Sequence, residues 1–171
     1  MSDEAFLRRP KGRWSPADHW RHLVKSVRPL ARALRLPRFA LRLLFGRARK
    51  PSRSYTEIRR TYRAALDAGG QAGRFAPAPV EISLDQAKAH RQSIARDWEK
   101  TSAALRTGLA AWNEPDLDRL RLPHPFLGKL TVREMILFTL YHNLHHVENV
   151  RNRLDSAHRD EAKDDEQNAG T

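Results

Sequence analysis

The stretch TVREMILFTLYHNLHHVENVRNRL, residues 131–154, decides the fold of this chain. It is an apolar segment that opens with Thr131 and Glu134 three residues apart, which is the spacing of a helix-capping box. The segment also contains three histidines within five positions, His142, His145 and His146. Because a protein core excludes polar groups that lack partners, this density of imidazoles indicates either a metal site or a coincidence.

Three other places in the chain carry the same helix-start pattern, a hydroxyl residue three positions before a carboxyl or amide residue. They are Ser15 with Asp18, Ser54 with Glu57, and Ser83 with Gln86. Each of these three starts is followed by residues that stop helices, namely Pro37, Gly69-Gly70 and Asn113-Glu114-Pro115. The sequence therefore predicts four helices, over roughly residues 15–36, 54–68, 83–112 and 131–154.

The predicted helices are amphipathic, and the first has an apolar stripe at helical spacing, from Leu23 to Leu34. Pro29 falls inside this stripe, so a bend or a local break is expected there. No useful length of the chain alternates apolar and polar residues, so no sheet is predicted. Four long amphipathic helices pack as a bundle, and the predicted fold class is an all-α four-helix bundle.

Two segments lie outside this plan. Residues 37–53 contain a short amphipathic piece followed by a basic run, which predicts an extra short helix that covers the bundle or, alternatively, contacts a membrane surface. Residues 155–171 are polar and acidic without apolar periodicity, and they are predicted to be a disordered tail. Residues 1–154 are accordingly expected to form a single domain.

Composition excludes several classes of protein. The chain has no cysteine, so disulfide frameworks, thiolate metal sites and thiol nucleophiles are excluded, and any metal must be bound by imidazole, carboxylate or backbone oxygen. No stretch approaches the roughly 20 apolar residues of a membrane span, and the N-terminus lacks the apolar core of a secretory signal. The expected location is the cytoplasm.

The charge is distributed unevenly along the chain. Of the 32 lysines and arginines and 20 acidic residues, residues 1–80 hold 19 and five, which gives +14, and the remaining 13 and 15 give −2. Such an asymmetry is typical either of a solvated basic face or of a face that binds an anionic partner, such as nucleic acid or a membrane surface.

The histidines themselves have the spacing of a metal site. His142 and His146 are four residues apart, so they stand on one face of a helix about one turn apart and can reach the same ion. His142 and His145 form an alternative pair at three residues apart. One helix supplies two such ligands, and a third must come from elsewhere in the bundle.

Two motifs near opposite ends of the chain resemble the DinB-like (DinB/YfiT-like) superfamily of four-helix-bundle metalloproteins. The first is Trp14-Ser15, Asp18 and His22-Leu23. The second is His124-Pro125, Gly128 and Leu130-Thr131, followed by His142 and His146. The resemblance implies one divalent metal bound by His22, His142 and His146, with zinc as the first expectation and nickel as the second. His19 lies nearer than His22 to the centre of the apolar stripe and is the alternative ligand.

The resemblance also implies a class of function. Members of the superfamily include thiol S-transferases and isomerases that use low-molecular-weight thiols, and others are described as metal-dependent hydrolases. A small-molecule substrate, with a low-molecular-weight thiol as cosubstrate, is expected. Asp18 and Glu148 are the expected acceptors that orient the ligand rings. The alternatives are a non-enzymatic basic helical protein that binds nucleic acid or an anionic membrane surface, and a helical scaffold that forms a homodimer.

Overall fold

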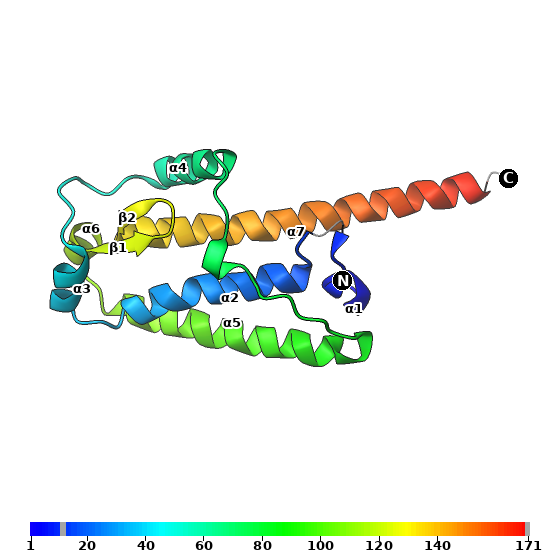
Figure 1. Ribbon diagram of the computed structural model, residues 1–171, viewed down its shortest axis with the longest axis horizontal. Helices are drawn as coiled ribbons and strands as arrows, with labels where there is room; N and C mark the ends of the chain where they lie inside the picture. The colour runs from blue at the N-terminus through cyan, green and yellow to red at the C-terminus, as the bar shows by residue number, and fades with distance from the viewer. Residues whose placement is uncertain (11–12, 170–171) are drawn as a thin grey trace.

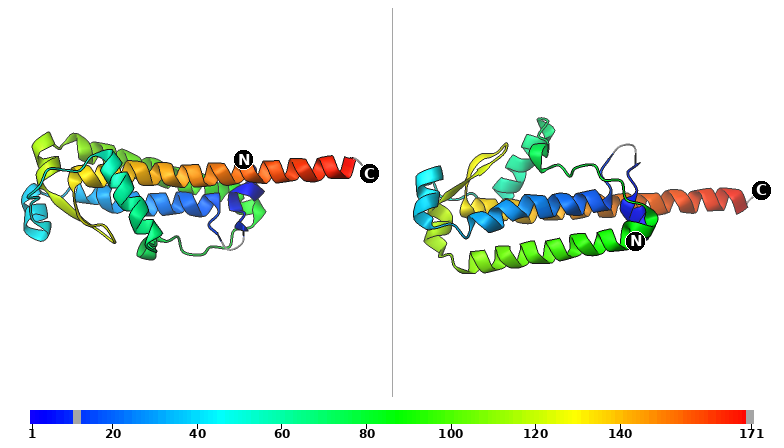
Figure 2. Two further views of the ribbon diagram at one scale, coloured as in Figure 1. Left: turned by 90° about the horizontal axis from the view of Figure 1, so that it is seen from above. Right: turned by 60° about the horizontal axis from the view of Figure 1, so that its bottom comes forward.

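The computed structural model describes residues 1–10 and 13–169, with side chains described as far as Ser156. Four long helices form most of the molecule: α2 (Pro16–Ala33), α4 (Tyr55–Asp67), α5 (Ala87–Ala110) and α7 (Val132–Ala169). Helix α7 packs against α2 and α4, and α5 packs along the other side of α2 (Figure 1). The predicted all-α class is confirmed, and α2 and α7 form the centre of the bundle (Figure 2).

Short elements join the long helices. They are the helices α1 (Asp3–Leu7), α3 (Arg38–Phe45) and α6 (Glu114–Arg119), the 3-10 turns η2 (Gly73–Phe75) and η3 (Leu84–Gln86), and the strands β1 (Arg121–His124) and β2 (Gly128–Thr131). The strands form an antiparallel hairpin that leads directly into α7. The sequence does not predict this hairpin, because strands of four residues are too short to show a period of two.

Capping boxes start three of the four long helices as predicted. The Ser15 hydroxyl accepts a hydrogen bond from the Asp18 backbone N–H, and the Asp18 carboxylate accepts from the Ser15 backbone N–H. The pairs Ser54–Glu57 and Thr131–Glu134 make the same reciprocal contacts. The fourth prediction was wrong: Ser83 makes no capping hydrogen bond, and a 3-10 turn precedes α5 there.

Two expectations about helix continuity meet the structure differently from the sequence analysis. Pro29 does not break α2, since the helix runs from Pro16 to Ala33, and the alternative of a bend at Pro29 stays a prediction. Helix α7 does not end near Leu154 but runs to Ala169, where no proline or glycine interrupts it and alanine, glutamate, lysine and glutamine favour helix. The expectation of a separate single domain over residues 1–154 stays a prediction.

The core lies mainly between α2, α4, α7 and the hairpin. Its fully buried side chains include Leu34, Leu41, Ile58 and Leu130, each at most 1% exposed. A smaller apolar cluster, around Phe6, joins α1 to α2 and α5. None of the helices in the described part of the chain combines the length and apolar character needed to span a bilayer.

The connection between α4 and α5 passes across α2 (Figure 1). Its turn η2 packs on α2, where the Ala76 carbonyl oxygen accepts a hydrogen bond from the Lys25 Nζ at 2.8 Å. This crossing places backbone from the middle of the chain beside the histidine-bearing parts of α2 and α7.

Candidate metal centre

Helices α2 and α7 bring three histidines together in the centre of the bundle. His22 comes from α2, and His142 and His146 come from successive turns of α7. One ring nitrogen of each lies within 4.8 Å of those of the other two, and all three side chains are buried. The Nε2 atom of His142 lies 3.1 Å from that of His22 and 3.2 Å from that of His146. The three residues that the superfamily resemblance implies are therefore neighbours.

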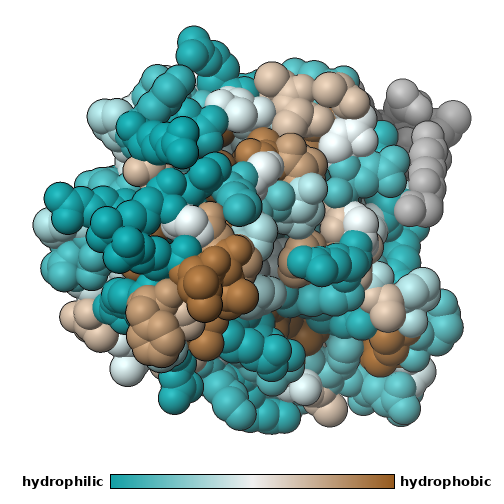
Figure 3. Space-filling view, turned by 60° about the vertical axis from the view of Figure 1, so that its left-hand side comes forward, coloured by the Kyte–Doolittle hydropathy of each residue, from teal (hydrophilic) through white to brown (hydrophobic). Residues whose placement is uncertain are grey.

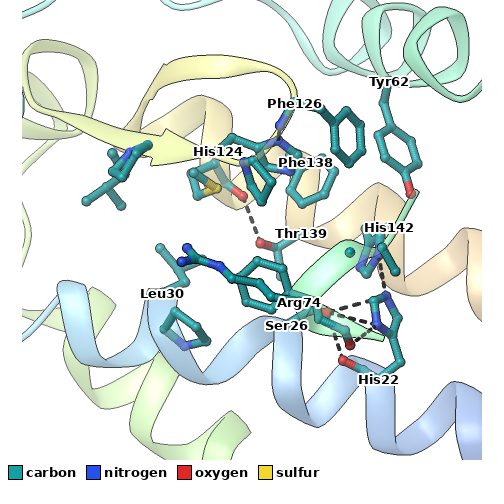
Figure 4. A pocket seen from close by; sticks show the side chains of 18 of the residues that line it. His22, Ser26, Leu30, Tyr62, Arg74, His124, Phe126, Phe138, Thr139 and His142 are labelled. Carbon is teal, nitrogen blue, oxygen red and sulfur yellow. Dashed lines mark hydrogen bonds between the residues drawn. The ribbon is translucent and has the colours of Figure 1, made fainter. Parts of the chain in front are cut away.

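A backbone carbonyl fixes the orientation of His22. Its Nδ1 lies 2.8 Å from the carbonyl oxygen of Phe75, in the turn η2 that crosses α2. A carbonyl oxygen only accepts hydrogen bonds, so the His22 Nδ1–H donates here. In the neutral ring the remaining nitrogen, Nε2, then carries a lone pair that faces His142 (Figure 4).

His146 is oriented by a fourth histidine, His19, which lies one turn before His22 on α2. The two Nδ1 atoms lie 2.7 Å apart, so one donates a hydrogen bond and the other accepts it. When His146 Nδ1 donates, its Nε2 carries the lone pair that faces the cluster. The Trp14 ring stacks on the His146 ring at 6.0 Å between centroids, which packs one side of the cluster.

The surroundings keep these rings neutral. Burial lowers the pKa of His142 to about 3 and that of His19 to about 4, and it lowers the pKa values of His22 and His146 as well. A neutral imidazole has a free lone pair, whereas a protonated one has none. At neutral pH the cluster therefore offers three uncharged nitrogen donors.

The geometry and chemistry of the cluster fit one bound ion. Two nitrogens bound to the same tetrahedral zinc at about 2.0–2.1 Å are roughly 3.3 Å apart, close to the two Nε2 separations given above. Direct hydrogen bonding satisfies the cluster poorly, because the single site on His142 Nε2 faces both His22 and His146. A shared cation would satisfy all three lone pairs, so these residues could hold a divalent metal.

Neither acidic side chain expected to orient the ligand rings does so. The Asp18 carboxylate caps α2 and accepts hydrogen bonds from Arg9, the nearer at 2.7 Å. Glu148 is exposed on α7. Their places are taken by the Phe75 carbonyl and by His19. The sequence could not indicate the carbonyl, because any residue carries one.

The remaining histidines of the region have other roles. His124 Nδ1 accepts hydrogen bonds from the backbone N–H groups of Phe126 and Leu127, which shapes the turn of the hairpin. His145 lies beside the cluster, with its Nε2 3.1 Å from the Asn149 side-chain nitrogen. It is not among the three residues that come together.

A large cavity opens beside the cluster. Its volume is about 870 Å³, and its lining includes His22, His142 and His146. Along α2 it extends from His22 to Ala33, roughly 17 Å at the rise of an α-helix. Aromatic and aliphatic side chains from α4, the hairpin and α7 form most of its wall, including Tyr62, Leu66, Phe126, Met135 and Phe138 (Figure 4).

Among the residues that the structure describes, the charged ones in the cavity lining are two arginines, Arg32 and Arg74, and no aspartate or glutamate lines it. Arg74 extends into the cavity from η2, with its guanidinium directed away from His22 and towards Leu30 (Figure 4). Its guanidinium carbon lies 5.1 Å from the centre of the Phe75 ring. The cavity is thus apolar, with the histidine cluster and positive charge at separate places.

These features define a class of protein: an all-α bundle whose two central helices carry a buried cluster of three histidines that could hold a metal ion. The chain belongs to the DinB superfamily, whose family model matches residues 1–150. That range includes both sequence motifs and all three clustered histidines. No curated protein and no solved structure matches the chain.

Proposed function

We propose that this protein is a metal-dependent enzyme that acts on a small, largely apolar molecule, as a thiol S-transferase or a hydrolase. The observation that supports the proposal is the convergence of the Nε2 atoms of His22, His142 and His146 beside an apolar cavity. A cluster buried without such a cavity would fit a purely structural ion. Membership of the DinB superfamily supports the same class of site.

Zinc, or nickel as second choice, would be held by the three neutral imidazoles and would supply a Lewis acid that lowers the pKa of water or of a low-molecular-weight thiol. The protein contributes the placement of these ligands. The Phe75 carbonyl accepts from His22, and His19 holds the outer nitrogen of His146, so neither ring is free to turn. The Phe75 carbonyl also keeps the proton of neutral His22 on Nδ1, so the His22 Nε2 lone pair stays free for a metal.

Tyr62 is the side chain best placed to act on a substrate near the cluster. Its ring lies 5.9 Å from that of His142, and its hydroxyl is directed towards the histidine (Figure 4). Burial raises the pKa of Tyr62 to about 12, so the hydroxyl keeps its proton at neutral pH. It can therefore donate a hydrogen bond to an oxygen of the substrate beside the metal centre.

The cavity lining indicates which molecules fit. Apolar side chains would cover the body of the substrate, and a volume of about 870 Å³ suits a molecule of cofactor or drug size. Arg32 and Arg74 would favour a substrate whose far end carries an anionic group, such as a carboxylate. In the described part of the chain, no acidic side chain lines the cavity and would repel that group.

Metal analysis of the purified, tag-free protein tests the metal site. We expect one divalent ion per chain in the wild type and its loss in His22→Ala, His142→Ala and His146→Ala. The matched control is His145→Ala, which removes an imidazole from the same helix outside the cluster. A protein that binds no metal, or variants that all keep it, would refute the site.

Activity assays then test the enzymatic part. The two reactions to measure are conjugation of a low-molecular-weight thiol to an apolar electrophile and hydrolysis of an apolar ester or amide. Activity should require the bound metal and disappear in His142→Ala. A protein with full metal occupancy that catalyses neither reaction would contradict the proposed enzymatic activity but would leave the proposed metal site intact.

A further inference from the structure

Helix α3 exposes an apolar surface at the end of the bundle. We name it the α3 patch, formed by Leu36, Phe39, Leu43 and Leu44. The side chains of Phe39, Leu43 and Leu44 are 74%, 84% and 61% exposed, and Leu36 is 40% exposed. In the space-filling view of this end, hydrophobic side chains form a raised cluster among hydrophilic ones (Figure 3).

The fold requires only part of this helix. Leu41 is fully buried and Phe45 packs against the main core, so one side of α3 covers the bundle as the sequence predicts. The other side contributes nothing to the core, although it carries three of the largest apolar side chains of the segment. Contiguous exposed apolar residues of this kind mark an interaction surface.

The part of the chain that carries the α3 patch is strongly basic. From residue 19 to residue 56 the chain contains eleven lysines and arginines and no aspartate or glutamate. The basic side chains that are exposed near the patch in the sequence are Arg35, Arg42, Arg47, Arg49 and Lys50. The acidic residues of the neighbouring α6 are already paired, Glu114 and Asp118 with Arg133, and Asp116 with Arg38.

The apolar side chains of the α3 patch and the basic residues near it favour one of three possible partners. A second copy of the chain would bring two arginine-rich segments together, and like charges at close range disfavour that contact. Nucleic acid would use the arginines but would leave Leu43 and Leu44 without a function, because phosphate contacts are polar. An anionic bilayer uses both, since its headgroups attract basic residues while its acyl region accepts apolar side chains.

We infer that the α3 patch docks this protein on an anionic lipid surface. The apolar side chains of α3 enter the interface, and the arginines and Lys50 contact the headgroups. This surface also adjoins the cavity, because Leu36 of the patch and Phe45 of α3 line it. Docking would therefore bring one side of the cavity next to the source of apolar molecules. The inference concerns α3 and does not depend on the metal site.

Co-sedimentation of the full chain with vesicles tests this inference. The vesicles contain phosphatidylcholine alone or phosphatidylcholine with phosphatidylglycerol. We expect binding to the anionic vesicles that weakens as salt is raised, and weaker binding to the neutral ones. In the double variant Phe39→Gln/Leu43→Gln, affinity for the anionic vesicles should fall by at least about tenfold.

The matched control removes equally bulky exposed residues elsewhere. Leu140 and Leu144 on α7 are 53% and 51% exposed, and Leu140→Gln/Leu144→Gln should bind vesicles as the wild type does. A second test variant, Arg42→Gln/Arg49→Gln, keeps the apolar side chains and should bind anionic vesicles more weakly through the loss of charge alone. Circular dichroism spectra check that every variant keeps the wild-type helix content.

Four results would overturn the inference. They are no binding to anionic vesicles, equal binding by the wild type and the Phe39→Gln/Leu43→Gln variant, a homodimer that this variant abolishes, and retention on DNA that this variant abolishes. The second would show binding by net charge alone. The third and fourth would assign the α3 patch to a second copy of the chain or to nucleic acid.

Discussion

The Nδ1 atoms of His19 and His146 lie 2.7 Å apart, which makes His19 the outer partner of a clustered histidine. The sequence leaves His19 open as an alternative to His22 for the third position. In the structure both are buried on α2, but only the His22 ring joins His142 and His146 in the group of three. His19 touches that group from outside.

The first prediction separates these two roles. His19→Ala should weaken metal binding by about ten- to a hundredfold without abolishing it, because His146 loses the partner that holds its ring. Competition with a chelator of known affinity measures the change, and His145→Ala serves as the control. If His19→Ala removed the metal as completely as His142→Ala does, His19 would have to be a ligand.

The second prediction concerns acid. Burial lowers the pKa of His124 to about 4, whereas an unfolded histidine titrates near 6.5. Below pH 6.5 the unfolded chain therefore binds more protons than the folded one, so stability is complete above that pH and is lost as pH falls towards 4. For His124 alone the loss at about pH 4.5 is about 2 to 3 kcal/mol.

Denaturant unfolding of the metal-free protein across this pH range measures that loss. His142, whose pKa burial lowers to about 3, adds a second contribution of the same sign. In His124→Asn an acceptor remains for the turn but the titrating ring is gone, so stability should depend less steeply on pH. A dependence as steep as in the wild type would show that other groups cause the acid sensitivity.

The third prediction concerns the anionic end of the proposed substrate. Decanoate and 1-decanol have the same apolar chain, and the carboxylate should bind more tightly because of Arg74 and Arg32. Arg74→Gln should reduce that preference by about 1.5 to 3 kcal/mol, the range for a hydrogen bond to a charged group.

Calorimetry on metal-free protein isolates this effect from any carboxylate contact with the metal. Arg35→Gln is the matched control, since Arg35 is exposed just after α2 and does not line the cavity. An unchanged preference for decanoate in Arg74→Gln would remove the arginine from substrate recognition.

The fourth prediction concerns the start of α2. The buried Asp18 carboxylate accepts from the Ser15 backbone, the Ser15 hydroxyl and Arg9, so Asp18→Ala should lower the free energy of unfolding by about 2 to 3 kcal/mol. Glu57→Ala at the exposed start of α4 removes the same kind of cap and should cost much less. Equal losses would mean that burial of the cap at Ser15 has no effect.

The sequence predicts the helical scaffold well because the signals are local. The pairs Ser15–Asp18, Ser54–Glu57 and Thr131–Glu134 lie within one turn, so capping chemistry is visible without knowledge of packing. Ser83 has the same pattern but makes no cap, since a 3-10 turn there displaces the start of α5. The hairpin escapes prediction because its strands are short and because Pro123 is unusual in a strand.

The site is only partly predictable from the sequence, because only some of its contacts are between residues close together in the chain. The spacing of His142 and His146 identifies a pair on one helix face, but the third member requires a resemblance to a family. The groups that orient the histidine rings cannot be predicted from the sequence. Phe75 acts through its backbone carbonyl, and the Asp18 carboxylate binds Arg9 in place of a histidine. Arg74 becomes notable only once η2 is seen to pack on α2.

The crossing of η2 over α2 has a consequence for when the histidine cluster forms during folding. The contact of His22 with Phe75 joins residues 53 apart in the chain, and its contact with His142 joins residues 120 apart. Pairings at such sequence distances close only after the intervening chain has collapsed. The unfolded polypeptide therefore has no preformed site. An ion that binds only the folded chain would stabilise it, and the melting temperature would rise with the logarithm of the ion concentration once that concentration exceeds the dissociation constant.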